Sequence, residues 1–573
     1  MRKPDSILLA LAAIFLLGLF ATEMSDSDSW WNLATGRYIV TEHRLPVPDP
    51  FAYTTAGAAP AYPGEERTRY FNLTHEWLAQ AVWYAIWSAG GAAAVVLWKA
   101  LLMTLLCGLT GLVAKWRTES WLWGTAAALA AAALAVEFAH DRPGILSYVF
   151  TAACMAIFES RASWRGTVAA RLTDDKRRSS VPRLWLVPPL LLIWANCHGG
   201  FFLGWIVCAA YAAEALWRRA PDWRRTLLVS GLAVAVSGIN PNGFGAIATV
   251  LRYRQSPMLT SLIEWSPADL WGPPYAFDVL LYAAAACLLL ACRGGKWRQV
   301  RPADLLLFLA FAAAAVTAFR NEMLIGLLAP VVSASYFPWK RRLPLVARYA
   351  AAAALGVAVV WGCARGSFFQ LRAAEWRYPA GAAQFLRDHR ITAPLFNTWE
   401  YGGYLIWSGQ RVFIDGRVLS ERVYQDYRNI LGTPPGDPRR DETLARYGIG
   451  AIVVNSFEYN SGVLYPLVPA MVEPAEAQWK LVYRDAQSMV FLRDVPDGVS
   501  ILDKHGVVDH LEEECTLHVE RDPEFSLCAR TLGDLFLRFG DRTRARRALG
   551  LYLAHPYADD PAARRAYADL LRR

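Results

Sequence analysis

The chain has 573 residues, of which 55% are hydrophobic and only 19% are charged, and it contains 24 Trp. This composition excludes an ordinary soluble globular protein and indicates a membrane protein. The net charge of +9 needs no nucleic-acid partner, because the excess Lys and Arg gather in loops on one side of the predicted membrane segments. We therefore expect membrane lipids, and no nucleic acid, among the partners.

Apolar runs that approach the length of a membrane span recur between Ser6 and Cys363. A hydrocarbon core of about 30 Å takes about 20 helical residues. We count eleven runs, at residues 6–22, 92–114, 121–138, 143–159, 184–197, 200–217, 226–239, 276–292, 303–318, 322–337 and 346–363. The sequence therefore predicts an α-helical polytopic membrane protein with about 11 transmembrane helices.

Basic residues mark one side of these runs. Arg2 and Lys3 precede the first run, and further Lys and Arg gather in alternate loops, at residues 115–117, 161–183, 218–225, 293–301 and 339–344. Because basic loops stay in the cytoplasm, we expect a cytoplasmic N terminus in a bacterial inner membrane. Everything after about Arg365 is then extracytoplasmic. No small-residue cleavage site follows the first run, which we interpret as a retained anchor.

The sequence predicts three regions. Residues 1–365 form a transmembrane domain with a long outer loop at 23–91, residues 366–500 an extracytoplasmic α/β domain, and residues 501–573 a helical tail. Residues 75–91 of the loop predict a helix that is too short and polar to span, and that lies on the membrane surface. The tail resembles a single tetratricopeptide repeat. One repeat cannot bury its own face, so the tail packs on the α/β domain or on a protein partner.

Within the predicted α/β domain, the spacing of apolar residues and the positions of turn residues predict individual helices and strands. They indicate a helix at 379–389, strands at 393–399, 410–417 and 450–455, and a hairpin at 479–494. The hairpin turn falls at Asp485 to Ser488. Cys515 and Cys528 also lie in the outer part of the chain, where an oxidising compartment permits a disulfide.

Asp26 and Asp28 directly follow the first apolar run, in the segment SDSDSWW. Two carboxylates at positions i and i+2 point the same way only in an extended chain. Such a pair beside a membrane can hold a divalent cation against a phosphate, or supply a general base and a charge stabiliser. The alternative is that the pair caps and solvates a helix end.

Other ionisable residues fall in the predicted outer loops, where groups at membrane depth are costly and are functional candidates. An Arg in such a loop can bind a phosphate. The structural alternatives are that an Asp or Glu stabilises the N-terminus of a helix, and that an Arg pairs with a nearby acidic side chain. The cytoplasmic loops show only basic runs, so we expect the chemistry outside. The outer candidates for binding a substrate or a lipid phosphate are His75, Glu76, Asp141, Arg142, His198 and Arg320, the last with Glu322 beside it.

This layout resembles the GT-C glycosyltransferase superfamily, whose members transfer sugars from polyprenyl-phosphate donors at the outer membrane face. The resemblance implies a catalytic carboxylate or metal ligand at Asp26 or Asp28, and a second-loop group at Asp141 and Arg142. A bound Mg²⁺ or Mn²⁺, if the enzyme uses one, is expected at Asp26, Asp28 and Asp141. Otherwise Arg142 or Arg320 supplies the positive charge.

The segment NTWEYGGYLIW, residues 397–407, is similar to the WWDYG motif of oligosaccharyltransferase catalytic subunits. Thr398 stands in place of the first Trp and Glu400 in place of Asp. The alternative is a Gly-Gly turn between a strand and a helix, with its aromatic residues packed on the membrane domain. The resemblance implies acceptor-site candidates at Trp399, Glu400 and Tyr401, to which Asp415 and Arg417 of the nearby segment FIDGR are added.

These features together predict a membrane glycosyltransferase that moves a sugar from a polyprenyl-phosphate-linked donor to an extracytoplasmic protein or glycan acceptor. The alternatives are a lipid or glycan transporter and a non-catalytic subunit of an envelope complex. A transporter carries ionisable residues at mid-span. The predicted span centres are almost wholly apolar, with Lys99 as the main exception.

Overall fold

The computed structural model describes residues 3–160, 181–253, 256–260, 262–272, 274–293, 300–337, 344–434, 437–459, 461–521, 526–554 and 560–572. Residues 161–180 of the predicted basic loop at 161–183, and most of the loops at 293–301 and 339–344, lie outside the described residues. The chain forms two compact units. The membrane unit comprises residues 1–26, 35–45 and 70–373, and the α/β unit comprises 27–34, 46–69 and 374–573.

This division differs from the predicted one at the outer loop. We assigned all of residues 23–91 to the membrane domain, but residues 27–34 and 46–69 belong to the α/β unit. The predicted tail belongs to the α/β unit as well. Its buried residues, such as Leu511 and Leu532, share one hydrophobic core with the strands. The α/β domain is thus the surface on which the tail packs.

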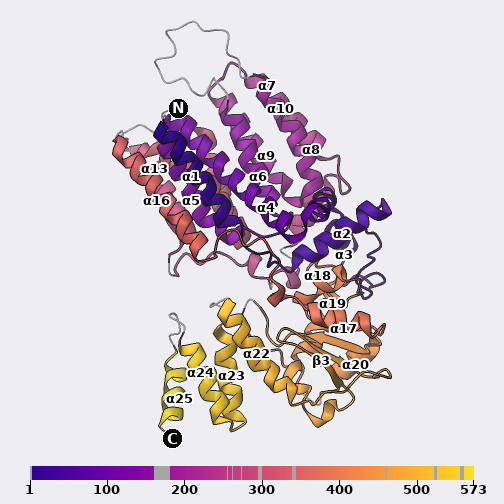
Figure 1. The fold of residues 1–573 in the computed structure, drawn as a ribbon. Helices are drawn as coiled ribbons and strands as arrows, with labels where there is room; N and C mark the ends of the chain where they lie inside the picture. Colours follow the sequence, from indigo (N-terminus) through magenta and orange to yellow (C-terminus); the bar gives the residue numbers. More distant parts are fainter. Residues whose placement is uncertain are drawn as a thin grey trace. The chain divides into compact units, whose positions relative to one another are not determined.

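Long apolar helices build the membrane unit (Figure 1). Each predicted run coincides with a helix, and within the described residues five helices are long and apolar enough to cross a membrane. The helices are α1 (Lys3–Phe20), α4 (Trp77–Thr118), α5 (Trp121–Ala135), α6 (Ile145–Glu159), α8 (Val187–Cys197), α9 (Phe202–Trp217), α10 (Trp223–Ser237), α13 (Ala276–Cys292), α14 (Pro302–Thr317), α15 (Met323–Tyr336) and α16 (Leu345–Ala364).

Shorter elements connect these helices. The first two, α2 and α3, lie in the long loop. The connecting elements are α2 (Asp28–Glu42), α3 (Glu65–Thr74), η1 (Val136–Phe138), α7 (Val181–Leu184), η4 (Gly199–Phe201), α11 (Gly245–Arg252), α12 (Pro257–Thr260), η6 (Ile263–Trp265) and η8 (Phe319–Asn321).

Small residues bring α4 and α5 into close contact. A Cβ atom added to Gly111 would lie 2.5 Å from the carbonyl oxygen of Gly124, and one added to Gly124 would lie 2.8 Å from the carbonyl oxygen of Gly111. Only glycine permits this approach of two backbones, which strengthens dispersion contacts where no hydrophobic effect drives helices together. Elsewhere α1 packs on α16, α8 on α10 and α13 on α15.

Helix α4 consists of two arms that meet at a kink. Gly90 and Gly91 have non-helical torsions, with φ of −167° and +58°. The positive φ at Gly91 is one that side chains rarely adopt, so glycine relieves the strain there. The predicted helix at 75–91 is therefore confirmed as a separate arm, and the predicted span at 92–114 begins directly after the kink.

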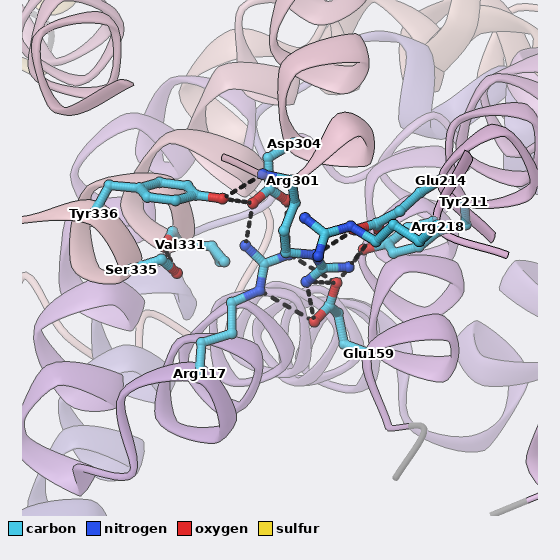
Figure 2. A network of polar contacts seen from close by, with 10 residues as sticks. All are labelled: Arg117, Glu159, Tyr211, Glu214, Arg218, Arg301, Asp304, Val331, Ser335 and Tyr336. Carbon is cyan, nitrogen blue, oxygen red and sulfur yellow. Dashed lines mark hydrogen bonds and ion pairs between the residues drawn. The ribbon is translucent and has the colours of Figure 1, made fainter. Parts of the chain in front are cut away.

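A buried ionic network joins the ends of α4, α6, α9 and α14 that the basic loops assign to the cytoplasmic side (Figure 2). Arg117 lies 2.7 Å from Glu159 and 2.8 Å from Asp304. Arg301 lies 2.8 Å from both Glu159 and Glu214. We predicted only basic runs on this side. The sequence did not single out the carboxylates of Glu159, Glu214 and Asp304, because they lie inside apolar helices rather than in loops.

The α/β unit contains a sheet of four strands in the order β1-β2-β4-β3. β1 and β2 are parallel, with Phe396 opposite Ile452, and β4 is antiparallel to both β2 and β3. The strands are β1 (Leu395–Asn397), β2 (Ala451–Val454), β3 (Lys480–Arg484) and β4 (Met489–Leu492). The helices are η9 (Glu375–Arg377), α17 (Ala380–Asp388), α18 (Trp399–Trp407), α19 (Glu421–Gly432), α20 (Pro438–Arg446), α21 (Leu467–Ala470), η10 (Pro474–Glu476), α22 (Gly506–Arg521), α23 (Leu527–Arg538), α24 (Arg542–Leu553) and α25 (Pro561–Leu571).

The predicted strands at 393–399 and 450–455, the helix at 379–389 and the hairpin are confirmed. The predicted strand at 410–417 is wrong. Only Val412 pairs there, through an isolated bridge to Ala52. The side chain of Asn397 replaces a neighbouring strand, because it accepts from the backbone N–H of Phe413 and donates to the carbonyl of Ile414.

Gly402 and Gly403 lie inside helix α18, so the alternative of a Gly-Gly turn between a strand and a helix is wrong. A Cβ atom at Gly402 would lie 2.3 Å from the carbonyl oxygen of Ile414, and one at Gly403 would lie 2.4 Å from that of Ser27. The two glycines therefore serve close packing, in spite of their low helix propensity.

A disulfide between Cys515 and Cys528 joins α22 to α23. The prediction that these cysteines could pair is confirmed. Figure 1 shows α22 to α25 as consecutive helices of the α/β unit, and α23 packs on α24.

Candidate functional site

Asp141 pairs with Lys99 instead of standing in an open outer loop. The Nζ atom of Lys99 lies 2.8 Å from Oδ1 of Asp141, and the two side chains are only 1% and 2% exposed. Lys99 also donates to the carbonyl and hydroxyl oxygens of Thr22, and the N–H of Ser25 donates to Asp141. The charge of Lys99 is thus satisfied within the membrane unit.

Asp26 lies in a charged cluster built from four separate parts of the membrane unit. Its Oδ2 atom lies 3.3 Å from Nε of Arg142 and 3.7 Å from Nδ1 of His140. Arg142 also pairs with Glu264, whose other oxygen lies 3.7 Å from Arg320. We call these five residues the charged cluster. Two carboxylates face two guanidinium groups, so the cluster is balanced when His140 is neutral.

Backbone elements between the membrane helices position the charged cluster. Glu264 lies in η6 and Arg320 in η8. The guanidinium of Arg320 lies 4.9 Å from the ring centre of Trp265, a cation–π contact, and the hydroxyl of Tyr148 donates to the carbonyl of Arg320. Burial alone would raise the pKa of Glu264, but Arg142 and Arg320 outweigh it and lower this pKa to about 2. Glu264 is therefore ionised at neutral pH.

The sequence did not identify two members of this cluster, His140 and Glu264. The only local sign of Glu264 is an acid in the segment SLIEWSP, between two apolar runs. The sequence also allows a pair of Arg320 with Glu322, but Glu322 is fully buried and accepts a hydrogen bond from Tyr275. Arg320 pairs with Glu264 instead, so sequence proximity misled the assignment of its partner.

His75, Glu76 and His198 form a second group in the membrane unit, which we call the histidine cluster. The Nε2 atoms of both His75 and His198 lie 3.5 Å from Oε1 of Glu76. Burial, then the neighbouring His75, Arg320 and Arg142, lower the pKa of His198 well below its usual value. The imidazole of His198 is therefore neutral at physiological pH.

Asp28 has partners in the α/β unit. It is the first residue of α2, and its Oδ1 atom accepts a hydrogen bond of 2.9 Å from Nε1 of Trp31. A Cβ atom at Gly416 would lie 1.9 Å from the same oxygen. The predicted extended pair is therefore not formed, because the helix begins at the second carboxylate.

The set predicted to hold Mg²⁺ or Mn²⁺, Asp26, Asp28 and Asp141, does not fit such an ion. Magnesium takes hard oxygen ligands in an octahedral arrangement. Here Asp26 is paired with Arg142, Asp141 is paired with Lys99, and Asp28 accepts from an indole. Side chains of the protein thus already supply the positive charge at Asp26 and Asp141.

The acceptor candidates lie in or near α18, and most are buried. Tyr401 donates to the carbonyl of Gln487 and has no exposed surface. Arg417 pairs with both Asp415 and Asp49 at 2.7 and 2.8 Å, in a network with almost no exposure. These contacts favour structural roles for Tyr401, Asp415 and Arg417.

Glu400 and Trp399 make fewer structural contacts than Tyr401, Asp415 and Arg417. Glu400 accepts from the hydroxyl of Tyr465 at 2.7 Å through Oε1, while its Oε2 atom is buried without a hydrogen bond. Burial, reduced by the Tyr465 hydrogen bond, raises the pKa of Glu400 to about 7. Trp399 is half-buried and contacts Tyr424 edge to face.

No protein-family model matches the chain, and no curated protein matches it. Solved structures do match. The Archaeoglobus fulgidus oligosaccharyltransferase AglB, in complex with an inhibitory peptide and a dolichol-phosphate, aligns over 87% of this chain and 75% of its own, with a TM-score of 0.54 and 13% identity. Its apo form aligns over 87% of this chain and 76% of its own, with a TM-score of 0.51 and 12% identity. The form tethered with an acceptor peptide containing the NVT sequon also aligns over 87% of this chain and 76% of its own. Its TM-score is 0.50 and its identity is 13%. The predicted GT-C fold is thereby confirmed.

Proposed function

We propose that this protein is a membrane glycosyltransferase that transfers a sugar from a polyprenyl-phosphate-linked donor to an acceptor at the outer face of a bacterial inner membrane. The observation that carries the proposal is the charged cluster, which gathers two carboxylates and two guanidinium groups between apolar helices. The fold supports it, because the matching oligosaccharyltransferase was solved with a dolichol-phosphate and, separately, with an acceptor peptide.

Asp26 is the carboxylate that we assign as general base, with Asp28 as the second candidate. Transfer to a hydroxyl or an amide requires removal of the acceptor proton as the new glycosidic bond forms. Asp26 lies at the end of the first span and next to a guanidinium that suits a phosphate. Asp28 has an indole and a glycine as neighbours, which favours a structural role in α2.

Arg320 and Arg142 are assigned to the donor phosphate. The leaving lipid phosphate gains negative charge as the sugar departs, so fixed cations lower the barrier. Arg320 is the more accessible of the two, since it is 33% exposed and its contact to Glu264 is 3.7 Å. A phosphate bound there would take the place of Glu264 on the guanidinium, in the bidentate geometry that Arg favours.

One of the two alternatives, a transporter, calls for ionisable residues at mid-span. Lys99 was the ionisable residue nearest to a span centre, and it is neutralised by Asp141. The carboxylates of Glu159 in α6 and Asp304 in α14 pair with Arg117, and Glu159 also pairs with Arg301, so these charges do not line a path. A non-catalytic subunit of an envelope complex stays a second candidate, which the experiment below separates from an enzyme.

The test is complementation of a deletion strain, read out by mass spectrometry of extracytoplasmic glycans and glycoproteins. The arms are wild type, Asp26→Asn, Asp28→Asn and Glu66→Gln, an exposed carboxylate in α3 that serves as control. We expect one sugar to be missing in the deletion, restored by wild type and Glu66→Gln, and not by Asp26→Asn at equal protein level. Full restoration by both Asp variants would refute the enzymatic assignment and favour the non-catalytic subunit.

A further inference from the structure

The histidine cluster has the donor set and spacing of a zinc site. One ligand atom from each of His75, Glu76 and His198 lies within 4.8 Å of the other two. Zinc binds imidazole nitrogen and carboxylate oxygen at about 2.0–2.2 Å in a tetrahedral arrangement, so neighbouring ligand atoms stand about 3.4 Å apart. Both nitrogens lie 3.5 Å from Oε1 of Glu76, which is close to that separation.

The hydrogen bond of His75 orients its lone pair toward Glu76. Its Nδ1 atom lies 2.9 Å from the carbonyl oxygen of Phe71, which can only accept, so Nδ1 carries the hydrogen. The Nε2 atom of the neutral ring then presents a lone pair to a carboxylate oxygen. A nitrogen lone pair that faces a carboxylate oxygen is a favourable arrangement for a shared proton or a bound metal ion. A ring nitrogen that donates to a backbone carbonyl while the other binds the metal is the usual arrangement of zinc-bound histidine.

His198 can adopt the same tautomer through Ser147. Its Nδ1 atom lies 2.7 Å from Oγ of Ser147 and 3.0 Å from the backbone nitrogen of Gly200. Without metal, Nδ1 accepts from the Gly200 N–H and the Nε2 hydrogen faces Glu76. With metal at Nε2, Nδ1 carries the hydrogen and donates to Ser147, whose hydroxyl oxygen has a second lone pair for the indole N–H of Trp194. This tautomer gives up the hydrogen bond that the Gly200 N–H donates to Nδ1 in the absence of metal.

We propose that His75, Glu76 and His198 bind one Zn²⁺ ion, with Ser147 as a positioning residue that sets the tautomer of His198. Two imidazoles and one carboxylate match Zn²⁺ better than Mg²⁺, which takes oxygen ligands. Three protein ligands leave a fourth position open to water or to an anionic group of a ligand. This proposal is independent of the transferase activity, because it concerns only metal binding.

The experiment uses the full-length protein purified in detergent, stripped with chelator and titrated with Zn²⁺ or Co²⁺ alone. Elemental analysis after dialysis gives the zinc content, and Co²⁺ absorption reports tetrahedral coordination. We expect about one zinc per chain in wild type. His75→Gln, Glu76→Gln and His198→Gln should each lose it, and Ser147→Ala should weaken binding about 10- to 100-fold.

His140→Gln is the matched control, because it removes an outer histidine of the charged cluster and none of the zinc ligands. It should keep the full metal content. A wild-type protein that takes up neither Zn²⁺ nor Co²⁺ would overturn the proposal, and this result does not depend on any variant folding. The proposal is equally refuted if His140→Gln loses the metal and His198→Gln keeps it.

Discussion

Lys99 in helix α4 and Asp141 in the connection between η1 and α6 form an ion pair of 2.8 Å with almost no exposure to solvent. Lys99 reaches its partner from a helix that the sequence places within the membrane. Each charge therefore depends on the other, since neither has access to bulk water.

Removing one member of this pair should destabilise the protein strongly. We expect Lys99→Met to lower the free energy of unfolding by about 3–5 kcal/mol, because it removes the cation that balances a buried carboxylate. The double variant Lys99→Met with Asp141→Leu should recover most of that loss. Thermal unfolding of the detergent-solubilised protein measures both, and a double variant no better than the single one would contradict the pairing.

Arg142 should tolerate no replacement, not even Lys. Its guanidinium contacts Asp26 through Nε and Glu264 through Nη2, which a single ammonium cannot reproduce. We expect Arg142→Lys to reduce the glycan product at least tenfold at equal protein level, as measured by mass spectrometry of complemented cells. Arg67→Lys, an exposed substitution in α3, is the control. Normal product from Arg142→Lys would remove Arg142 from the proposed site.

The buried carboxyl of Glu400 predicts a pH dependence of stability. Burial, reduced by the hydrogen bond from Tyr465, raises its pKa from 4.5 to about 7 in the folded protein. Between these two values the unfolded state loses its proton first, so stability falls as pH rises from 4.5 to 7. Glu400→Gln cannot ionise, and above pH 7 it should be more stable than wild type by on the order of 3 kcal/mol. Melting temperatures from pH 4 to 8 provide the measurement, and curves that stay parallel would contradict the raised pKa.

The ionic network of Figure 2 should support the membrane unit. Arg117→Leu leaves Asp304 and Glu159 with one cation fewer inside the helix bundle, and we expect a loss of about 3 kcal/mol. Arg293→Leu, at an exposed position after α13, should change stability little. Thermal unfolding distinguishes the two, and equal melting temperatures would mean that the network adds no net stability.

The disulfide between Cys515 and Cys528 closes a loop with a sequence separation of 13. Opening it should cost the α/β unit about 3 kcal/mol, chiefly because the unfolded chain gains freedom. The double variant Cys515→Ala with Cys528→Ala measures this cost by thermal unfolding. A reducing agent should lower the melting temperature of wild type toward that of the variant, and should leave the variant unchanged.

Local patterns in the sequence determined the membrane helices, the hairpin at Asp485 to Ser488 and the resemblance to GT-C enzymes. Hydropathy, the spacing of apolar residues and turn residues each depend on positions that are neighbours along the chain. These patterns can therefore be recognised without knowing which other segment they contact. The same patterns placed the candidate charges in the outer loops. They failed at residues 410–417, where a side chain from another segment, Asn397, takes the hydrogen bonds of a strand partner.

Which charges meet depends on how the helices pack. Asp26 and Asp28 are two residues apart, yet the first pairs with Arg142 and the second with an indole. Glu264 joins the charged cluster from more than one hundred residues beyond Arg142. An ion pair depends on atoms within about 4 Å in space, and helix packing alone brings such distant segments together. The sequence thus determined which side chains are available, and the packing of the helices determined their partners.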